Sequence, residues 1–295
     1  MIKKEIRIGN TAIGGRQPVR IQSMTNTDTA DVEATTAQIH ALEDAGCEIV
    51  RVAAYDTDSA QCIRKLKDAC NIPIVADVHF DYKIALKAIE AGADKVRINP
   101  GNIGDAAKIR MVADAAKSAG IPIRVGANTG SLGKTYWGME KSEALVQSAL
   151  ENVRCLERAG FYDIVIALKA SDVAASVRAY RKMDVLVDYP LHLGITEAGA
   201  YDSSIVKSAM GIGALLLDGI GDTLRVSITG DPLQEIRAAK EILQCAGRRT
   251  FSPEIIACPT CGRTRIQLET LYHQVKALTA DIPQYLKIAV MGCVV

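Results

Sequence analysis

The sequence predicts a TIM barrel, the closed (β/α)8 fold, followed by a small second domain. Short β-branched runs alternate with amphipathic helical stretches through most of the 295 residues, which is typical of βα units on a parallel sheet. Eight such units in about 250 residues match the usual size of this barrel. An open doubly wound sheet would more often carry a glycine-rich phosphate loop after its first strand, and here Thr25-Asn26-Thr27-Asp28 follows instead.

The predicted elements follow in order along the chain. We expect strands at residues 19–24, 48–53, 72–78, 95–99, 121–128, 163–170, 191–196 and 223–229. Apolar residues recur on one face of stretches 31–45 and 142–159, which predicts helices between the strands. Glycines that can end a helix in the left-handed conformation precede four strands, at Gly46, Gly92, Gly120 and Gly160. We interpret residues 211–221 as a helix end and a loop rather than a ninth strand.

A change of pattern at Ser252-Pro253 sets the predicted domain boundary. We expect the barrel to occupy residues 1–250 and a small α+β domain to occupy residues 251–295. A module of this size is too small to be stable without a metal or a partner.

Composition excludes several classes of protein. The 35 basic and 34 acidic residues leave a net charge of +1, which argues against the broad basic surface of a nucleic-acid-binding protein. No apolar run reaches the roughly 18 residues of a membrane span, and the N-terminus lacks a signal pattern. We therefore expect a cytoplasmic protein with no nucleic-acid or membrane partner. Five of the eight cysteines lie at irregular spacing in helical patterns and are interpreted as reduced thiols.

Arginines occupy strand positions where a buried parallel strand should be apolar. They are Arg51, Arg97, Arg124 and Arg225. A charge inside such a strand is costly, so each needs a reason.

Other polar residues share faces with these arginines, because side chains alternate with a period of two. The same-face pairs are Arg97 with Asn99, Arg124 with Asn128, Lys169 with Ser171, His192 with Thr196, and Arg225 with Ser227. We expect them to line the mouth at the C-terminal strand ends, where barrel enzymes keep their active sites. Several cations and donors around one volume suit the oxygens of a diphosphate.

Each of these assignments has a structural alternative. An arginine can pair with a barrel carboxylate such as Asp77 and hold the interior together. Glu197, a carboxylate placed among cations, is the best candidate for proton transfer, but it can also form a structural ion pair. His79 and His192 are either ligands or proton donors, or hydrogen-bonded structural histidines.

Three cysteines near the C-terminus suggest a metal site. Cys258 and Cys261 stand in a Cys-x2-Cys spacing, and Cys293 follows later. Three thiolates can hold an iron-sulfur cluster and leave one iron for another ligand. With His273 as a fourth ligand, the same set would form a structural Cys3His zinc site, and spacing alone does not separate the two.

Seven ordered motifs resemble the GcpE family, the 4-hydroxy-3-methylbut-2-en-1-yl diphosphate synthases. They are Ile21-Gln-Ser-Met-Thr, Val96-Arg-Ile-Asn-Pro-Gly-Asn-Ile-Gly, Arg124-Val-Gly-Ala-Asn, Leu191-His-Leu-Gly-Ile-Thr-Glu-Ala-Gly, Gly219-Ile-Gly-Asp-Thr, Cys258-Pro-Thr-Cys-Gly-Arg and Met291-Gly-Cys-Val-Val. The resemblance runs over essentially the whole chain. It implies a TIM barrel plus a [4Fe-4S] domain in the non-mevalonate route to isoprenoid precursors, and it favours iron over zinc.

The resemblance also implies a substrate and roles for residues. The substrate would be 2-C-methyl-D-erythritol 2,4-cyclodiphosphate, reduced by two electrons from flavodoxin or ferredoxin with loss of water. Glu197 would manage a proton, and Cys258, Cys261 and Cys293 would hold the cluster. The diphosphate would be held by Arg51, Arg97, Asn99, Arg124, Asn128, Lys169, Ser171, His192, Arg225 and Ser227. A homodimer is expected, in which one subunit's cluster domain caps the other's barrel.

One departure from the family pattern is expected to matter. The family continues after Met-Gly-Cys-Val-Val through Asn-Gly-Pro-Gly-Glu, whose glutamate is the fourth cluster ligand, whereas this sequence stops at Val295. We therefore expect an incomplete cluster domain. Two alternatives to the reductase are a zinc-containing barrel transferase acting on a phosphorylated or pterin-like substrate, and an inactive diphosphate-binding fragment.

Overall fold

The first of two compact units is a closed barrel of parallel strands. The computed structural model describes residues 2–280, 282 and 284–293, and the chain divides into the units Met1–Ile242 and Leu243–Val295. The barrel strands are β3 (Arg20–Met24), β4 (Ile49–Ala53), β5 (Ile74–Asp77), β6 (Lys95–Arg97), β7 (Ile123–Asn128), β8 (Ile164–Lys169), β9 (His192–Leu193) and β10 (Thr223–Leu224). They pair in the order β8-β7-β6-β5-β4-β3-β10-β9, and a parallel bridge between Ile166 and Leu191 closes the ring. The predicted TIM barrel is confirmed.

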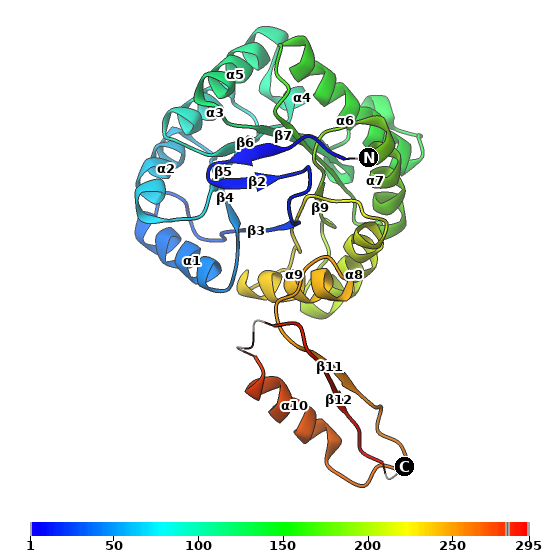
Figure 1. The fold of residues 1–295 in the computed structure, drawn as a ribbon. Coiled ribbons are helices and arrows are strands. Elements are labelled where there is room, and N and C mark those ends of the chain that lie inside the picture. Colours follow the sequence, from blue (N-terminus) through cyan, green and yellow to red (C-terminus); the bar gives the residue numbers. More distant parts are fainter. Residues whose placement is uncertain (1, 281, 283, 294–295) are drawn as a thin grey trace. The chain divides into compact units, whose positions relative to one another are not determined.

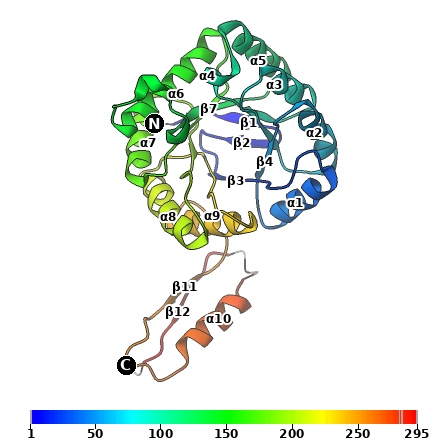
Figure 2. The same cartoon turned by 180° about the vertical axis from the view of Figure 1, so that it is seen from behind.

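Helices surround the ring of strands in both opposite views (Figures 1 and 2). They are α1 (Val32–Asp44), α2 (Thr57–Ala69), α3 (Tyr82–Glu90), α4 (Pro100–Ile103), α5 (Ala106–Ala119), α6 (Lys141–Arg158), α7 (Val173–Leu186), α8 (Tyr201–Leu217) and α9 (Leu233–Cys245), with short 3-10 turns η1 (Thr129–Ser131) and η2 (Lys134–Tyr136). The four glycines expected before strands all have positive φ, from 67° at Gly120 to 97° at Gly46. Residues 211–221 form the end of α8 and a loop, as expected. None of the described helices is long and apolar enough to cross a membrane.

Several strands are shorter than expected, because they give way early to the loops of the mouth. The strands expected at 191–196 and 223–229 are each two residues long as β9 and β10. β6 ends at Arg97 because Asn99 already caps α4, its side chain accepting a hydrogen bond from the Gly101 amide. Extended residues without a paired neighbour look like strand in sequence.

An N-terminal hairpin, which the sequence reasoning did not predict, covers one end of the barrel. β1 (Ile6–Ile8) and β2 (Thr11–Ile13) pair antiparallel around Gly9-Asn10. The hairpin crosses the centre of the ring in Figure 1. Its isoleucines form one buried cluster with barrel residues, made of Ile6, Ile8, Ile13, Ile49, Val75 and Val165. The Gly-Asn turn between two alternating apolar runs was the available signal.

The second unit is a small βαβ module. β11 (Glu254–Ala257) and β12 (Lys287–Val290) run parallel, and α10 (Leu268–Leu278) lies between them in sequence. In the described residues of its βαβ part, 254–293, the buried apolar side chains are Leu268 and Val290. So few buried residues fit the expectation that this unit needs a further source of stability.

Candidate active site

A cavity of about 270 Å³ lies at the C-terminal ends of the barrel strands. Eight of the predicted site residues line it, namely Arg51, Arg97, Asn99, Arg124, Asn128, Lys169, Arg225 and Ser227. Met24, Asp77, His79, Gly126 and Thr196 also line it. Arginines from separate strands therefore converge on one volume, at the end of the barrel where the fold places active sites.

Asp77 ties two of the arginines together. Its carboxylate stands 3.0 Å from Arg97 Nη1 and 3.5 Å from Arg51 Nε, and Arg97 also contacts His79 Nε2 at 3.1 Å. Burial alone would raise the pKa of Asp77, but Arg51, His79 and Arg97 outweigh it and lower that pKa well below its usual value. Arg51 and Arg97 therefore do pair with a barrel carboxylate, as the structural alternative in the sequence analysis had it, and they also line the cavity.

Arg124 and Lys169 lack such a partner among the described residues. Arg124 is 3% exposed, and its Nη1 has no hydrogen-bond partner. Burial, reinforced by Arg51 and Arg97, lowers the pKa of Arg124. The pKa of Lys169 is lowered as well, mainly by burial and then by the nearby charges of Arg124 and Arg51. Both side chains would be better satisfied with an anion in the cavity.

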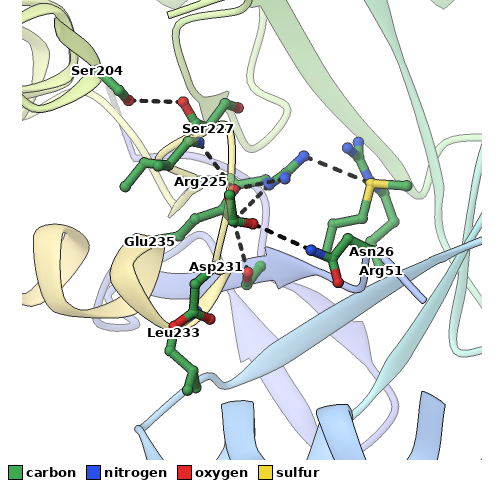
Figure 3. Close-up of polar contacts among 12 residues, drawn as sticks. Asn26, Arg51, Ser204, Arg225, Ser227, Asp231, Leu233 and Glu235 are labelled. Carbon is green, nitrogen blue, oxygen red and sulfur yellow. Dashed lines mark hydrogen bonds and ion pairs between the residues drawn. The ribbon is translucent and has the colours of Figure 1, made fainter. Parts of the chain in front are cut away.

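Arg225 is held by a buried glutamate that the sequence reasoning missed. Its Nε and Nη2 donate to the two carboxylate oxygens of Glu235 at 2.9 and 2.8 Å (Figure 3). Arg51 and Arg225 both point toward Met24, whose sulfur lies 3.1 Å from Arg51 Nε and 3.7 Å from Arg225 Nη1.

The mouth carries more positive than negative charge. Five cations line the cavity, namely Arg51, Arg97, Arg124, Lys169 and Arg225. Asp77 is the carboxylate among the lining residues, and Glu235 adds a second behind Arg225. Five against two leaves three positive charges in excess, which suits a multivalent anion.

Further polar side chains lie buried in the barrel but do not line the cavity. Lys95 Nζ donates to Gln22 Oε1 at 3.3 Å, and His192 Nδ1 contacts Thr223 Oγ1 at 2.8 Å. Gln22 Nε2 and His192 Nε2 have no hydrogen-bond partner among the described residues. Burial, then Arg124 and Lys169, lowers the pKa of His192, so its ring is neutral near pH 7.

Glu197 and Ser171 are exposed and do not line the cavity. Glu197 has φ of 53°, the one positive φ at a non-glycine residue in the part of the chain described. A Cβ added to Gly130 would stand 3.2 Å from Glu197 Oε1, so this carboxylate lies against the loop after β7. Asn128 caps that loop by accepting from the Gly130 amide, and it donates to Thr196 Oγ1.

The three cysteines lie near one end of the β11–β12 pair. Cys258 follows β11 and its amide donates to Val290 O at 3.2 Å, while Cys293 bridges to Thr264. Cys261 begins a tight turn in which its amide donates to Thr264 Oγ1. All eight cysteines are free thiols, but no three His, Cys, Asp or Glu side chains among the described residues are close enough to share a metal ion. Val294 and Val295 of the last motif lie outside the described residues.

Donor chemistry nevertheless fits a thiolate-bound metal group. Hydrogen bonds from Arg263, together with Thr264, lower the pKa of Cys261 and so favour its thiolate. The thiol of Cys258 is half-buried and that of Cys261 is exposed, and only Pro259 and Thr260 separate them in sequence, which is the Cys-x2-Cys spacing that metal groups use.

Comparison with known proteins gives the family. The GcpE TIM-barrel domain matches residues 3–240, and the GcpE protein C-terminal domain matches residues 254–295. The chain belongs to the GcpE family. Family membership confirms the resemblance drawn from the seven motifs.

Three curated relatives of this family member share one name, 4-hydroxy-3-methylbut-2-en-1-yl diphosphate synthase (flavodoxin). The protein of Caldanaerobacter subterraneus is 55% identical over 100% of this chain and 84% of its own length. That of Fusobacterium nucleatum is 52% identical over 98% of this chain and 83% of its own length. That of Geobacillus thermodenitrificans is 50% identical over 99% of this chain and 79% of its own length.

Solved structures share the fold of this GcpE chain at low identity. A Yersinia pestis dihydropteroate synthase matches with a TM-score of 0.61 and 8% identity, covering 83% of this chain and 100% of its own. An N-acetylneuraminic acid synthetase from Leptospira borgpetersenii has a TM-score of 0.58 and 14% identity, covering 94% and 97%. At these identities the likeness supports the barrel alone.

Proposed function

We propose that this chain is a 4-hydroxy-3-methylbut-2-en-1-yl diphosphate synthase. It would open the ring of 2-C-methyl-D-erythritol 2,4-cyclodiphosphate by adding two electrons and the matching protons, with one hydroxyl leaving as water. The observation that carries the proposal is the cavity with three positive charges in excess, in a chain whose curated relatives share this activity.

The lining cations would bind and orient the diphosphate. Arg124 and Lys169, which have no carboxylate partner among the described contacts, supply the strongest attraction for phosphate oxygens. Arg51, Arg97 and Arg225 are held by carboxylates and keep fixed directions. Asn99, Asn128 and Ser227 add neutral donors on the same cavity wall. We propose that Ser171 and His192 act from its margin, because neither lines it.

Glu197 is the proposed proton-transfer residue. Its left-handed backbone costs free energy in a non-glycine residue, about 1–2 kcal/mol. Such strain persists where the surrounding loops fix the side chain in place. The carboxyl group beside Gly130, in its protonated form, would then transfer a proton near the departing hydroxyl.

Cys258, Cys261 and Cys293 are the proposed holders of a [4Fe-4S] cluster. When bound, the cluster would pass single electrons and act as a Lewis acid, which protein side chains cannot do. The relatives' printed name supports flavodoxin as the electron donor, with ferredoxin as the other expected donor.

The test is anaerobic purification followed by turnover with the cyclodiphosphate and reduced flavodoxin. We expect a brown, iron-containing protein that forms the hydroxymethylbutenyl diphosphate. A colourless protein with stoichiometric zinc would support the transferase alternative instead. Binding without turnover, after cluster reconstitution and with a strong reductant, would support the diphosphate-binding fragment.

A homodimer is also proposed, through the outer face of α8. From Ser208 to Leu217 this helix has no charged residue. Val206, Met210 and Leu217 are 59%, 62% and 73% exposed and share one helical face with Gly213. Lys207 and Asp218 flank the uncharged stretch. An antiparallel two-fold pairing would place the Lys207 end against the Asp218 end of a second copy, so apolar and charged parts both match.

Sedimentation of the Met210→Glu variant tests this interface. We expect a dimeric wild type and a monomeric variant. Met111→Glu is the control, because Met111 is 49% exposed on α5, whose outer face carries charged residues. A monomeric wild type, or a dimer that Met210→Glu leaves intact, would refute the interface.

A further inference from the structure

Glu235 lies in the first turn of α9 and is only 2% exposed. Its carboxylate accepts four hydrogen bonds. Two come from Arg225, one from Ser23 Oγ at 2.7 Å and one from the Ile228 amide at 3.2 Å. Every good acceptor direction of the carboxylate is therefore in use.

These bonds join three parts of the barrel where its first and eighth strands pair. Ser23 belongs to β3, the first barrel strand, and Arg225 directly follows β10, the eighth. Ile228 lies in the loop that carries Ser227, a residue of the cavity wall. That loop is held from other sides as well, by Ser204 donating to Ser227 O and by Asn26 donating to Gly230 O (Figure 3).

Bidentate pairing also fixes which part of Arg225 faces the cavity. Nε and Nη2 are both taken by Glu235, so the guanidinium plane is set and Nη1 stays on the side of Met24 and the cavity. Without the carboxylate, the long side chain would regain rotamer freedom, and the wall loop would lose the bond to the Ile228 amide.

We propose that Glu235 is a positioning residue for anion binding, which aims Arg225 Nη1 and the Ser227 loop at the substrate diphosphate. This inference rests on the proposed function, because it assigns the diphosphate to the cavity. Glu235 itself does not line the cavity and acts through Arg225.

A conservative variant, Glu235→Gln, removes the charge and keeps the shape. One amide nitrogen would then face a donor, so Arg225 could keep at most one of its two bonds. We expect the dissociation constant of inorganic pyrophosphate, measured by titration calorimetry on the full chain, to rise about 10-fold to 100-fold, as expected for one charge-assisted hydrogen bond. The dissociation constant of Glu235→Asp, whose side chain is shorter by one methylene, should lie between those of wild type and Glu235→Gln.

Glu48→Gln is the matched control. Glu48 also joins an arginine to a backbone amide, accepting from Arg20 Nη1 at 2.7 Å and from the Ile21 amide at 2.9 Å, near the N-terminal end of β3. The Glu48→Gln variant should have a lower thermal stability than wild type and an unchanged affinity for pyrophosphate. A role through Arg225 requires that Glu235→Gln add little to Arg225→Ala when the two are combined.

Three outcomes overturn the inference. An unchanged dissociation constant in folded Glu235→Gln would show that the carboxylate only stabilises the fold, and a lower one would show that it repels the anion. An effect of equal size in the Arg225→Ala background would show that Glu235 does not act through Arg225. If wild type binds neither pyrophosphate nor the cyclodiphosphate, the proposed function fails as well, whereas the first two outcomes leave it standing.

Discussion

Replacing Arg124 by methionine should separate binding from stability. Arg124 is 3% exposed, its Nη1 has no partner among the described residues, and it lies next to Arg97 across the β6–β7 ladder. Methionine keeps much of the volume and removes the charge. In the absence of ligand, losing an unsatisfied buried donor should leave stability unchanged or raise it by about 1–3 kcal/mol.

Binding should change in the opposite direction. A guanidinium that meets a phosphate bidentately forms two charge-assisted hydrogen bonds, and each contributes about 1.5–3 kcal/mol. We therefore expect the affinity for the cyclodiphosphate to fall by at least about 3 kcal/mol, roughly 150-fold.

Two measurements on the same protein check this prediction. Urea denaturation without ligand gives the free energy of unfolding, and titration calorimetry gives the dissociation constant. Arg154→Met, on the exposed side of α6, controls for the loss of one positive charge at long range. A variant that loses more than about 2 kcal/mol of stability while its affinity stays within threefold of wild type would refute the reasoning.

Three further predictions concern pH, packing and the cysteines. Burial, Arg124 and Lys169 lower the pKa of His192 below 6.5, so the unfolded state binds the extra proton. The free energy of unfolding should therefore fall as the pH drops through about 6.5, and urea denaturation at several pH values should show a smaller fall in His192→Gln. Gly126→Ala would place a Cβ 1.9 Å from the Ala167 carbonyl oxygen and should lower stability by about 3 kcal/mol, the upper end of overpacking costs; an unchanged melting temperature would contradict this. Cys293→Ser should abolish visible absorbance and bound iron while the barrel keeps its thermal transition, and loss of the whole fold would contradict the assignment to a separate unit.

The barrel and much of its mouth could be predicted because charge inside a strand is a strong signal. Arg97 and Arg124 stand between apolar neighbours, and the period of two fixes which residues share their face. Their convergence then follows from barrel closure, which brings the C-terminal strand ends together. The structure confirms that convergence, while the binding roles remain predictions.

Glu235 shows what the sequence could not reveal. An acidic residue in the first turn of a helix is ordinary, since it favours the helix dipole. Its partners Ser23 and Arg225 are 212 and 10 residues away, and only the closed ring brings them together. Pair information of that kind is absent from local patterns, whereas the Gly9-Asn10 hairpin was a local signal that the sequence reasoning overlooked.

Three of the five cations that line the cavity have carboxylate partners and two do not, and this difference affects how strongly the site would attract an anion. Arg51, Arg97 and Arg225 have carboxylate partners that fix their directions, whereas Arg124 and Lys169 are buried with lowered pKa values and no such partner among the described contacts. The free barrel therefore holds an electrostatic cost that an anion would relieve, and a dianion would relieve more of it than a monoanion. Saturating diphosphate at 100 times its dissociation constant should stabilise the fold by about 2.7 kcal/mol. If chloride, a monoanion, and diphosphate stabilised the barrel equally at matched ionic strength, this charge excess would have no preference for a multivalent anion such as the proposed substrate.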